Sequence, residues 1–373
     1  MNIPIIDLKK QYEPLRSNIQ KAIQDVLEKG TYVLGPEVEK LEKDLAHYCK
    51  VPYALGNSSG TDALLLALLT IEIEPGDEVI TTALSFFATA EVISFLKAKP
   101  VFVDIDPQTY CIDPSKIESA ITPKTKAIIP VHIFGQCADM DLILKLAKKY
   151  NLYVIEDACQ AIGAEYKGRK TCSLGDFGCL SFYPSKNLGT YGDGGMLFTK
   201  DESHFISARE YRTHGEYPKT YRHKKIGMNA RISSIAAAIL NVKFPHIDEW
   251  NQKRREKAQT YYALFEENNL LDTITLPQTA PDNTHVYHLY IILSEYKNEL
   301  REYLQKECIQ TGNHFPIPLP YLECFKNLNA HPGDFPVAEK ICAQSVALPL
   351  YPELTFEQQA YVVSKIKTFY QSK

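Results

Sequence analysis

Between about residues 50 and 200, short apolar runs rich in β-branched residues alternate with stretches whose apolar residues recur at helical spacing. The runs that predict strands are 78–82, 100–105, 127–131, 152–157, 177–182 and 195–199. Strands that are apolar throughout are typical of a mostly parallel sheet covered by helices on both faces. Such a sheet binds its ligands at the carboxyl ends of its strands. We therefore look for functional residues in the segments that follow the strands.

The regions on either side of this sheet predict helices and a second, smaller domain. Apolar residues at helical spacing predict one helix over residues 12–26. Residues 232–262 predict another helix with one interruption, at Pro245. Beyond it, strand and helix patterns alternate with proline-rich connections, and the last helix starts with a capping box. We expect a large domain over residues 1–245 and a small α+β domain over residues 246–373.

Charge and hydropathy argue against several classes of protein. The 373 residues include 41 Lys+Arg and 45 Asp+Glu, so the chain has no basic excess with which to bind nucleic acid. The longest apolar runs, such as 63–71, fall short of the roughly 20 residues that a membrane-spanning helix needs. The first residues do not form a signal peptide, and the 9 cysteines include no Cys-x-x-Cys. We expect a cytoplasmic protein that binds neither nucleic acid nor membrane.

Residues 57–64, Asn-Ser-Ser-Gly-Thr-Asp-Ala-Leu, follow a short apolar run and open an apolar helix. Gly60 lets the backbone approach a ligand closely, and the free N–H groups at a helix start suit an anion such as phosphate. The serines can equally form an ordinary N-cap. The motif is therefore compatible with a phosphate site or with a plain helix start.

Glu156 and Asp157 stand at the end of a strand that should be central in the sheet. A carboxylate there is costly to bury unless it meets a positive partner, which a protonated heteroaromatic nitrogen would supply. The alternative is that both residues cap the next helix. Because neighbouring residues must divide between two environments, we take Asp157 as the functional member of the pair.

Lys186 lies in a glycine-rich loop, residues 181–195, that follows another buried strand. A lysine removed from water has a lowered pKa and becomes a nucleophilic amine. The ordinary alternative is a solvated surface lysine. The loop is not a Walker motif, and no Gly-x-Gly-x-x-Gly lies near the first strand, which disfavours a nicotinamide dehydrogenase.

A phosphate cradle, a carboxylate at a strand end and a lysine in a loop together suit pyridoxal phosphate. The lysine would bind the cofactor covalently, the aspartate would pair with the pyridinium nitrogen, and the helix start would hold the phosphate. Each motif is weak alone, but the combination in this order is specific.

Over nearly its whole length the chain resembles the nucleotide-sugar aminotransferases of the DegT/DnrJ/StrS type. The motifs that carry the resemblance are residues 4–8, 30–37, 60–64, 75–80, 103–106, 156–157, 181–195, 227–231 and 314–318. The resemblance implies a fold-type-I pyridoxal phosphate transferase. Its large domain would hold a mostly parallel central sheet flanked by helices, and two chains would form a homodimer with shared active sites.

The resemblance also implies a role for particular residues. Lys186 and Asp157 match the Schiff-base lysine and the partner of the pyridinium nitrogen, and Gln160 matches the contact to the phenolic oxygen. The remaining cofactor contacts would come from Gly60, Thr61 and Ser181 (phosphate), Phe86 (stacking on the ring, or plain core packing) and Asn229 (phosphate of the other subunit). The substrate side would include Arg231, His314 and Phe315.

The implied reaction moves the amino group of L-glutamate to a nucleotide-linked keto sugar, for amino sugars of surface polysaccharides or glycoconjugates. We expect a 3-keto hexose linked to UDP or dTDP, with amination at carbon 4 as the alternative. The family also includes dehydratases, in which another residue, typically histidine, replaces this lysine. Because Lys186 is present, a dehydratase is disfavoured. A third possibility is a regulatory or sugar-nucleotide-binding protein without catalysis on the same fold.

The ten histidines do not cluster at the spacing of metal ligands, so we predict no metal site. His132, His285 and His288 have strand-like contexts. We expect them to be packed and hydrogen-bonded.

Overall fold

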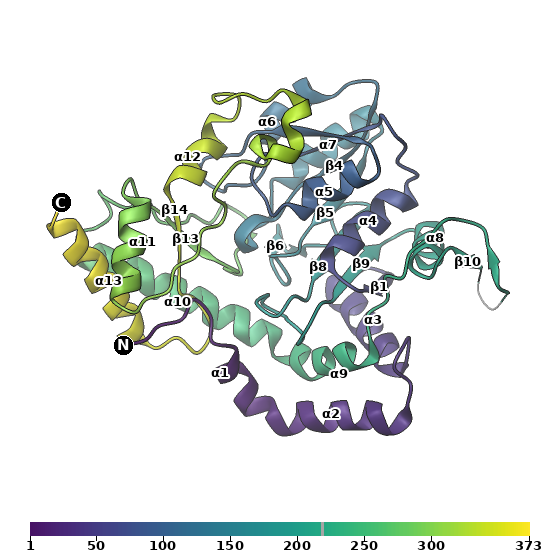
Figure 1. The fold of residues 1–373 in the computed structure, drawn as a ribbon, viewed down its shortest axis with the longest axis horizontal. Helices are drawn as coiled ribbons and strands as arrows, with labels where there is room; N and C mark the ends of the chain where they lie inside the picture. The colour runs from purple at the N-terminus through teal and green to yellow at the C-terminus, as the bar shows by residue number, and fades with distance from the viewer. Residues whose placement is uncertain (218–219) are drawn as a thin grey trace.

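A seven-stranded sheet forms the centre of the computed structural model, which describes residues 1–217 and 220–373 (Figure 1). Its strands are β1 (Tyr53–Asn57), β2 (Glu78–Thr82), β3 (Lys99–Val103), β4 (Thr125–Ile129), β5 (Tyr153–Asp157), β8 (Phe177–Ser181) and β9 (Gly195–Thr199). They lie in the order β1-β9-β8-β5-β4-β2-β3. β9 is antiparallel to both neighbours, and every other adjacent pair is parallel. The mostly parallel sheet is confirmed, and each predicted strand coincides with an observed one to within two residues.

Helices cover both faces of this sheet (Figure 1). They include α3 (Pro36–Cys49), α4 (Gly60–Thr70), α5 (Ala88–Phe95), α6 (Pro114–Ile117), α7 (Met140–Tyr150), α8 (Glu202–Arg212) and α9 (Ser234–Lys243). Alternate residues of β9 pack on opposite sides: Met196 and Phe198 join α3 and α9, whereas Leu197 joins α4 and α8. α4 is apolar on all sides and almost wholly buried, as expected for a helix enclosed between a sheet and other helices.

The helix predicted over residues 12–26 is divided in two. α1 (Leu8–Tyr12) and α2 (Arg16–Lys29) are separated by a short 3₁₀ turn, Glu13–Leu15. Pro14 lies in that turn and has no N–H to donate to a continuing α-helix. α2 ends at Gly30, whose φ of 69° is the left-handed conformation that glycine adopts without strain.

A second apolar core is built from the carboxyl-terminal part of the chain. Its elements are α10 (Ile247–Glu267), β13 (Tyr290–Leu293), α11 (Lys297–Lys306), β14 (Ser345–Leu348) and α13 (Phe356–Gln371). β13 and β14 pair antiparallel. Pro245 lies in a 3₁₀ turn between α9 and α10, so the predicted interruption is confirmed. The capping box of α13, formed by Thr355 and Gln358, is also present.

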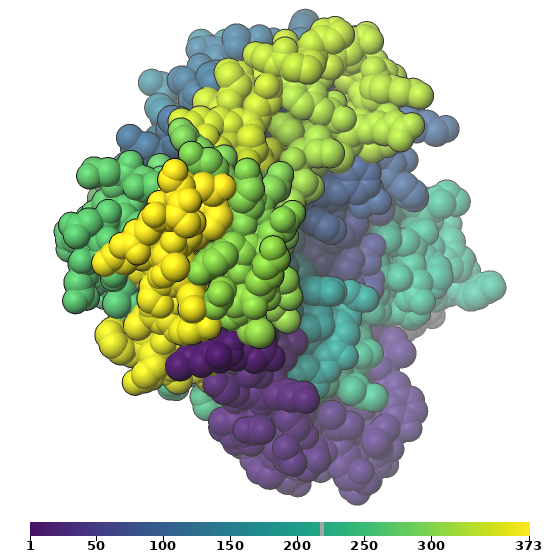
Figure 2. All heavy atoms as spheres, turned by 60° about the vertical axis from the view of Figure 1, so that its left-hand side comes forward, coloured from purple at the N-terminus to yellow at the C-terminus, as the bar shows by residue number. Residues whose placement is uncertain are grey.

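The amino-terminal residues belong to this second core. Ile3 is fully buried in it and forms a parallel bridge with Ile309, and the Ile3 N–H donates to the Cys308 carbonyl over 2.9 Å. Figure 2 shows this segment, in purple, lying against the yellow and green carboxyl-terminal elements. The division into domains over residues 1–245 and 246–373 stays a prediction.

Short elements complete the described chain: β6 (Glu165–Tyr166), β7 (Arg169–Lys170), β12 (Asn283–Thr284), the paired β10 (Glu216–Tyr217) and β11 (Arg222–His223), and α12 (Pro336–Gln344). In the part of the chain that the structure describes, no helix combines the length and apolar composition needed to cross a membrane.

Candidate active site

Most of the residues that the sequence singled out meet in one cavity of about 490 Å³. It lies beyond the carboxyl ends of β1, β2, β5 and β8, where the ligands of such sheets bind. The predicted residues that line it are Gly60, Thr61, Phe86, Asp157, Gln160, Ser181, Lys186, His314 and Phe315. Residues that act together in one site must line the same cavity, as these do.

The start of α4 forms one end of the cavity. Ser59 is the N-cap, and its Oγ accepts the Asp62 N–H over 3.0 Å. The N–H groups of Gly60 and Thr61 have no hydrogen-bond partner among the described residues, so they remain available to an anion. The motif thus forms a serine N-cap and also presents two free N–H groups to an anion, so the two interpretations of the sequence are compatible.

Gly60 has no room for a side chain. A Cβ at this position would lie 2.7 Å from Cys159 Sγ and 2.8 Å from Ser181 Cβ. The backbone at the start of α4 therefore approaches the segments after β5 and β8 directly. This close approach brings the start of α4 next to Ser181.

The carboxylate of Asp157 faces the cavity from the end of β5. It is 6% exposed, its Oδ2 accepts the Thr89 hydroxyl over 2.7 Å, and its Oδ1 accepts the Cys159 N–H over 3.2 Å. No described Lys, Arg or His forms an ion pair with it. A cationic group of a ligand could therefore supply the missing partner.

Lys186 follows β8, and its backbone N–H donates to the Tyr183 carbonyl over 2.9 Å. Burial lowers the pKa of Lys186 below its ordinary value, and the charges of Cys159 and Asp157 oppose that shift in part. The Nζ makes no hydrogen bond with any residue that the structure describes. These properties suit a nucleophilic amine.

Gln160 and the aromatic residues complete the wall. Gln160 Oε1 accepts the Phe134 N–H over 2.9 Å, which leaves its NH₂ group for a ligand acceptor. Phe86 is 59% exposed, and its ring centroid lies 6.5 Å from that of Phe315. An exposed aromatic ring at a cavity can pack against a flat ligand.

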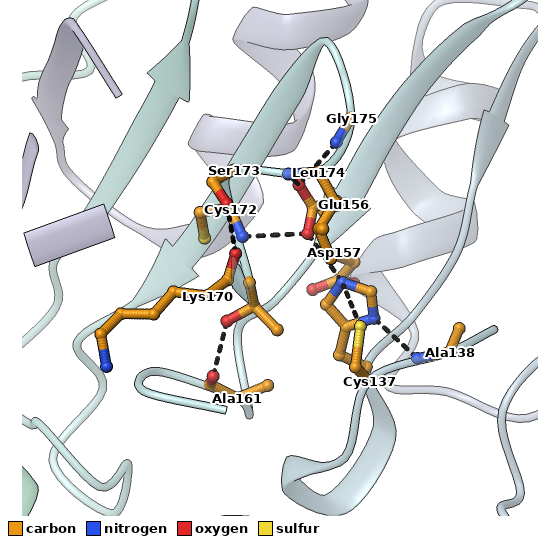
Figure 3. A network of polar contacts seen from close by, with 12 residues as sticks. Cys137, Ala138, Glu156, Asp157, Ala161, Lys170, Cys172, Ser173, Leu174 and Gly175 are labelled. Atoms are coloured by element: carbon orange, nitrogen blue, oxygen red, sulfur yellow. Dashed lines mark hydrogen bonds and ion pairs between the residues drawn. The ribbon is translucent and has the colours of Figure 1, made fainter. Parts of the chain in front are cut away.

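Glu156 points away from the cavity, as the division of the pair predicts. It has no exposed surface and accepts hydrogen bonds from the turn before β8 and from His132 (Figure 3). No helix follows β5 directly, so the alternative that Glu156 and Asp157 cap a helix is wrong.

The three histidines expected to be packed and hydrogen-bonded differ from one another, and none lies within a strand. His132 and His285 are buried and hydrogen-bonded. His288 instead lines the cavity, and its buried Nδ1 has no partner among the described residues. Burial is the first cause that lowers the pKa of His288 well below 6.5, and the charge of Lys186 is the second. The expectation for His288 is therefore wrong.

Other cavity residues were not predicted. They are Ser59, Leu64, Ser85, Ala88, Cys159, Tyr183, Ser185, Asp193, Gly194, His288 and Leu289. Several lie inside the motifs already described, so proximity in the sequence could have found them. His288 and Leu289 precede a strand instead of following one, and the rule of strand ends gives no signal for them.

Asn229 and Arg231 do not line the cavity of their own chain. Asn229 is exposed, and its Oδ1 accepts the Arg231 Nε–H over 3.0 Å. The predicted contact of Asn229 is with another subunit, so this placement leaves it a prediction. The same holds for Arg231 and the sugar nucleotide.

The donor set fits pyridoxal phosphate group by group. The free N–H groups and the Ser181 hydroxyl suit a phosphate, the unpaired Asp157 carboxylate suits a pyridinium, and the Lys186 amine suits an aldehyde carbon. The NH₂ of Gln160 suits a phenolate oxygen. Within residues 1–217 and 220–373, no three His, Cys, Asp or Glu side chains are placed to hold a metal ion.

Comparison with known proteins agrees with this chemistry. Residues 14–367 match the model of the DegT/DnrJ/EryC1/StrS aminotransferase family. A pleiotropic regulatory protein of Geobacillus stearothermophilus is 46% identical, over 99% of each chain. The UDP-2-acetamido-2-deoxy-3-oxo-D-glucuronate aminotransferase of Pseudomonas aeruginosa is 41% identical, over 94% of this chain and 96% of its own.

Solved structures agree over the same length. The crystal structure of S. venezuelae DesV in complex with a ketimine intermediate has a TM-score of 0.95 and 38% identity, and the match covers 99% of this chain and 98% of that one. NtdA from Bacillus subtilis with bound cofactor PMP has a TM-score of 0.91 and 33% identity, over 98% of this chain and 85% of its own. The predicted fold-type-I architecture, the aminotransferase activity and the dependence on pyridoxal phosphate are thereby confirmed. The chain belongs to the DegT/DnrJ/EryC1/StrS aminotransferase family.

Proposed function

We propose that the protein transfers the amino group of L-glutamate to carbon 3 of a keto hexose that is linked to a nucleoside diphosphate. The observation that carries the proposal is the single cavity that holds the Lys186 amine, the Asp157 carboxylate and the Gln160 amide. Carbon 3 is supported by the relative in Pseudomonas aeruginosa, whose name specifies a 3-oxo sugar linked to UDP.

The residues of the cavity divide the work between holding the cofactor and moving a proton. When bound, pyridoxal phosphate supplies an electron sink for the charge that develops at the α-carbon of the amino donor. The N–H groups of Gly60 and Thr61, with the Ser181 hydroxyl, hold its phosphate. Asp157 keeps the proton on the ring nitrogen, and Phe86 packs against the ring. Gln160 donates to the phenolic oxygen.

Lys186 is the acid–base group of the reaction. Its lowered pKa leaves a larger share of neutral amine at physiological pH than an exposed lysine has. The neutral Nζ would take the proton from the α-carbon of glutamate and pass it to carbon 4′ of the cofactor. In the second half-reaction it would take a proton from that carbon and deliver it to carbon 3 of the sugar. Arg231, His314 and Phe315 bind the sugar nucleotide.

The active form is a cytoplasmic homodimer with shared sites. Asn229 is exposed and lies outside its own cavity, which supports a contact with the phosphate group in the other subunit. Two-fold symmetry makes such a contact reciprocal. The product serves the synthesis of amino sugars for surface polysaccharides or glycoconjugates.

Two other functions can be distinguished from this one by experiment. A nucleotide-sugar 4-aminotransferase would use the same cofactor residues and differ only in how the sugar is placed. A regulatory protein is favoured by the name of the relative from Geobacillus stearothermophilus. The complete set of Lys186, Asp157 and Gln160 in one cavity favours catalysis.

The test is a panel of UDP- and dTDP-linked 3-keto and 4-keto sugars, assayed with L-glutamate and with Lys186→Ala as the blank. NMR of the product identifies the aminated carbon. We expect amination at carbon 3, and amination at carbon 4 would contradict the proposal. Bleaching of the yellow holoprotein by L-glutamate tests the enzyme against the regulatory protein. A protein that binds the cofactor but never bleaches would support regulation.

A further inference from the structure

Glu156 is fully buried beside Asp157, and four donors occupy its two carboxylate oxygens (Figure 3). Oε1 accepts the N–H groups of Leu174 over 2.7 Å and Gly175 over 2.8 Å. Oε2 accepts the N–H of Cys172 over 2.9 Å and a hydrogen bond from His132 Nε2 over 3.0 Å. Only a carboxylate can accept at all of these positions.

The first three donors belong to the turn that leads into β8. Only Asp176 separates residues 172–175 from Phe177, where β8 begins. β8 ends at Ser181, five residues before Lys186. Backbone N–H groups bound to a charged oxygen make short, strong hydrogen bonds. Glu156 thereby fixes the start of the strand that delivers Ser181 and Lys186 to the cavity.

The fourth donor, His132, opens the connection that follows β4. Its Nδ1 accepts the Ala138 N–H over 3.2 Å, so the ring proton is on Nε2 and points at Glu156. The backbone N–H of His132 donates to the Asp157 carbonyl over 3.0 Å. Two residues later, the Phe134 N–H donates to Gln160 Oε1 over 2.9 Å.

We propose that Glu156 is a positioning residue for the reaction. It lies between Asp157, the connection that orients Gln160, and the turn that leads to Lys186, and it holds all three in register. The inference rests on the proposed roles of those residues, since Glu156 itself touches neither cofactor nor substrate. An apolar side chain of similar size would leave three buried backbone N–H groups and His132 without an acceptor, which is costly. The carboxylate therefore fixes these segments relative to one another.

Glu156→Gln is the sharpest test because glutamine has the same shape. Its NH₂ group must face either the Leu174 and Gly175 N–H groups or the Cys172 N–H, so donors oppose one another in both orientations. We expect kcat to fall roughly 10- to 100-fold, as for a small displacement of reacting groups. We also expect the absorbance of the substrate-free holoprotein to titrate at higher pH. A displaced Asp157 no longer keeps the ring nitrogen protonated, and without that positive charge the linked Lys186 nitrogen holds its proton more tightly.

Ile366→Ala is the matched control. Ile366 is fully buried in the second core, so this variant lowers the Tm by creating a cavity far from the site. We expect it to leave kcat and the titration midpoint unchanged. If Glu156→Gln behaves in the same way, Glu156 only stabilises the fold and the inference is wrong.

If Glu156→Gln does not fold, His132→Leu decides the question with the same measurements. Leucine cannot donate to Glu156, so the variant leaves Glu156 with its three backbone donors and removes its link to the connection after β4. A shifted midpoint supports positioning, and an unchanged one refutes it. The midpoint is measured without sugar, so an error in the proposed acceptor does not affect the result. A wild-type protein with no absorbance band would remove the proposed function and this inference together.

Discussion

Replacing His285 by asparagine should make the protein less sensitive to acid. His285 is 4% exposed, and its ring lies on that of Tyr287 with centroids 3.9 Å apart. Its Nδ1 accepts the Tyr287 N–H over 2.9 Å, so a second proton would place two donors face to face. Burial is the main cause that lowers the pKa of His285 from 6.5 to about 3, and a hydrogen bond with the backbone of Gly135 opposes it.

The magnitude follows from the difference between the folded and unfolded pKa values. Between pH 6.5 and about 3 the unfolded chain binds a proton at this histidine and the folded protein does not. Stability therefore falls as the pH falls, by about 1.4 kcal/mol per pH unit. From pH 7.5 to 5.0 the loss due to His285 is about 2 kcal/mol. Asparagine keeps an acceptor near the position of Nδ1 but does not titrate.

Urea unfolding of wild type and His285→Asn, followed by the fluorescence of Trp250, measures the effect. At pH 7.5 the variant should be the less stable protein, because it loses the contact with Tyr287. At pH 5.0 the difference should shift by about 2 kcal/mol in favour of the variant. Between pH 7.5 and 9.0 the difference should stay constant, because this histidine is neutral in both states. Stability curves that remain parallel down to pH 5.0 would refute the reasoning.

Three further predictions concern the site. Asp157→Ala should lower kcat by ~10²–10³-fold, as on removal of one electrostatic stabiliser, while cofactor is still bound; near-normal turnover would contradict its role. Equal amounts of Lys186→Ala and Asn229→Ala chains, refolded together, should recover about a quarter of wild-type activity, and no recovery in hybrids confirmed by native mass spectrometry would exclude shared sites. Thiol labelling at pH 8 should modify exposed Cys308 before Cys159, whose pKa burial raises well above 9; mass spectrometry reads the order.

The sheet could be predicted because burial on both faces leaves a signal in each strand separately. The antiparallel direction of β9 could not, because its apolar run looks the same whichever way the neighbouring strands point. The helix predicted over residues 12–26 breaks because one proline outweighs an otherwise regular apolar spacing. Strand patterns report burial, and chain direction depends on connections that they do not describe.

The residues of the candidate site likewise divide into those that could be predicted from the sequence and those that could not. Asp157 and Lys186 could be found because they follow strands whose ends meet at one edge of the sheet. Thr89, which donates to Asp157, lies 68 residues away in a helix, and its sequence context gives no sign of that contact. Glu156 was recognised only as the less functional neighbour of Asp157. Its hydrogen bonds come from backbone groups, which every residue possesses, so no side-chain pattern could have revealed them.

The bridge between Ile3 and Ile309 has a consequence for folding during synthesis. Ile3 leaves the ribosome before the residue that pairs with it, which follows about 300 positions later. At 5–20 residues per second, the amino-terminal segment waits roughly 15–60 s without its partner. The central sheet is translated within this interval and can fold first, whereas the second core cannot close until the first and last parts of the chain meet. Until then the apolar amino-terminal segment stays exposed to chaperones and to other nascent chains.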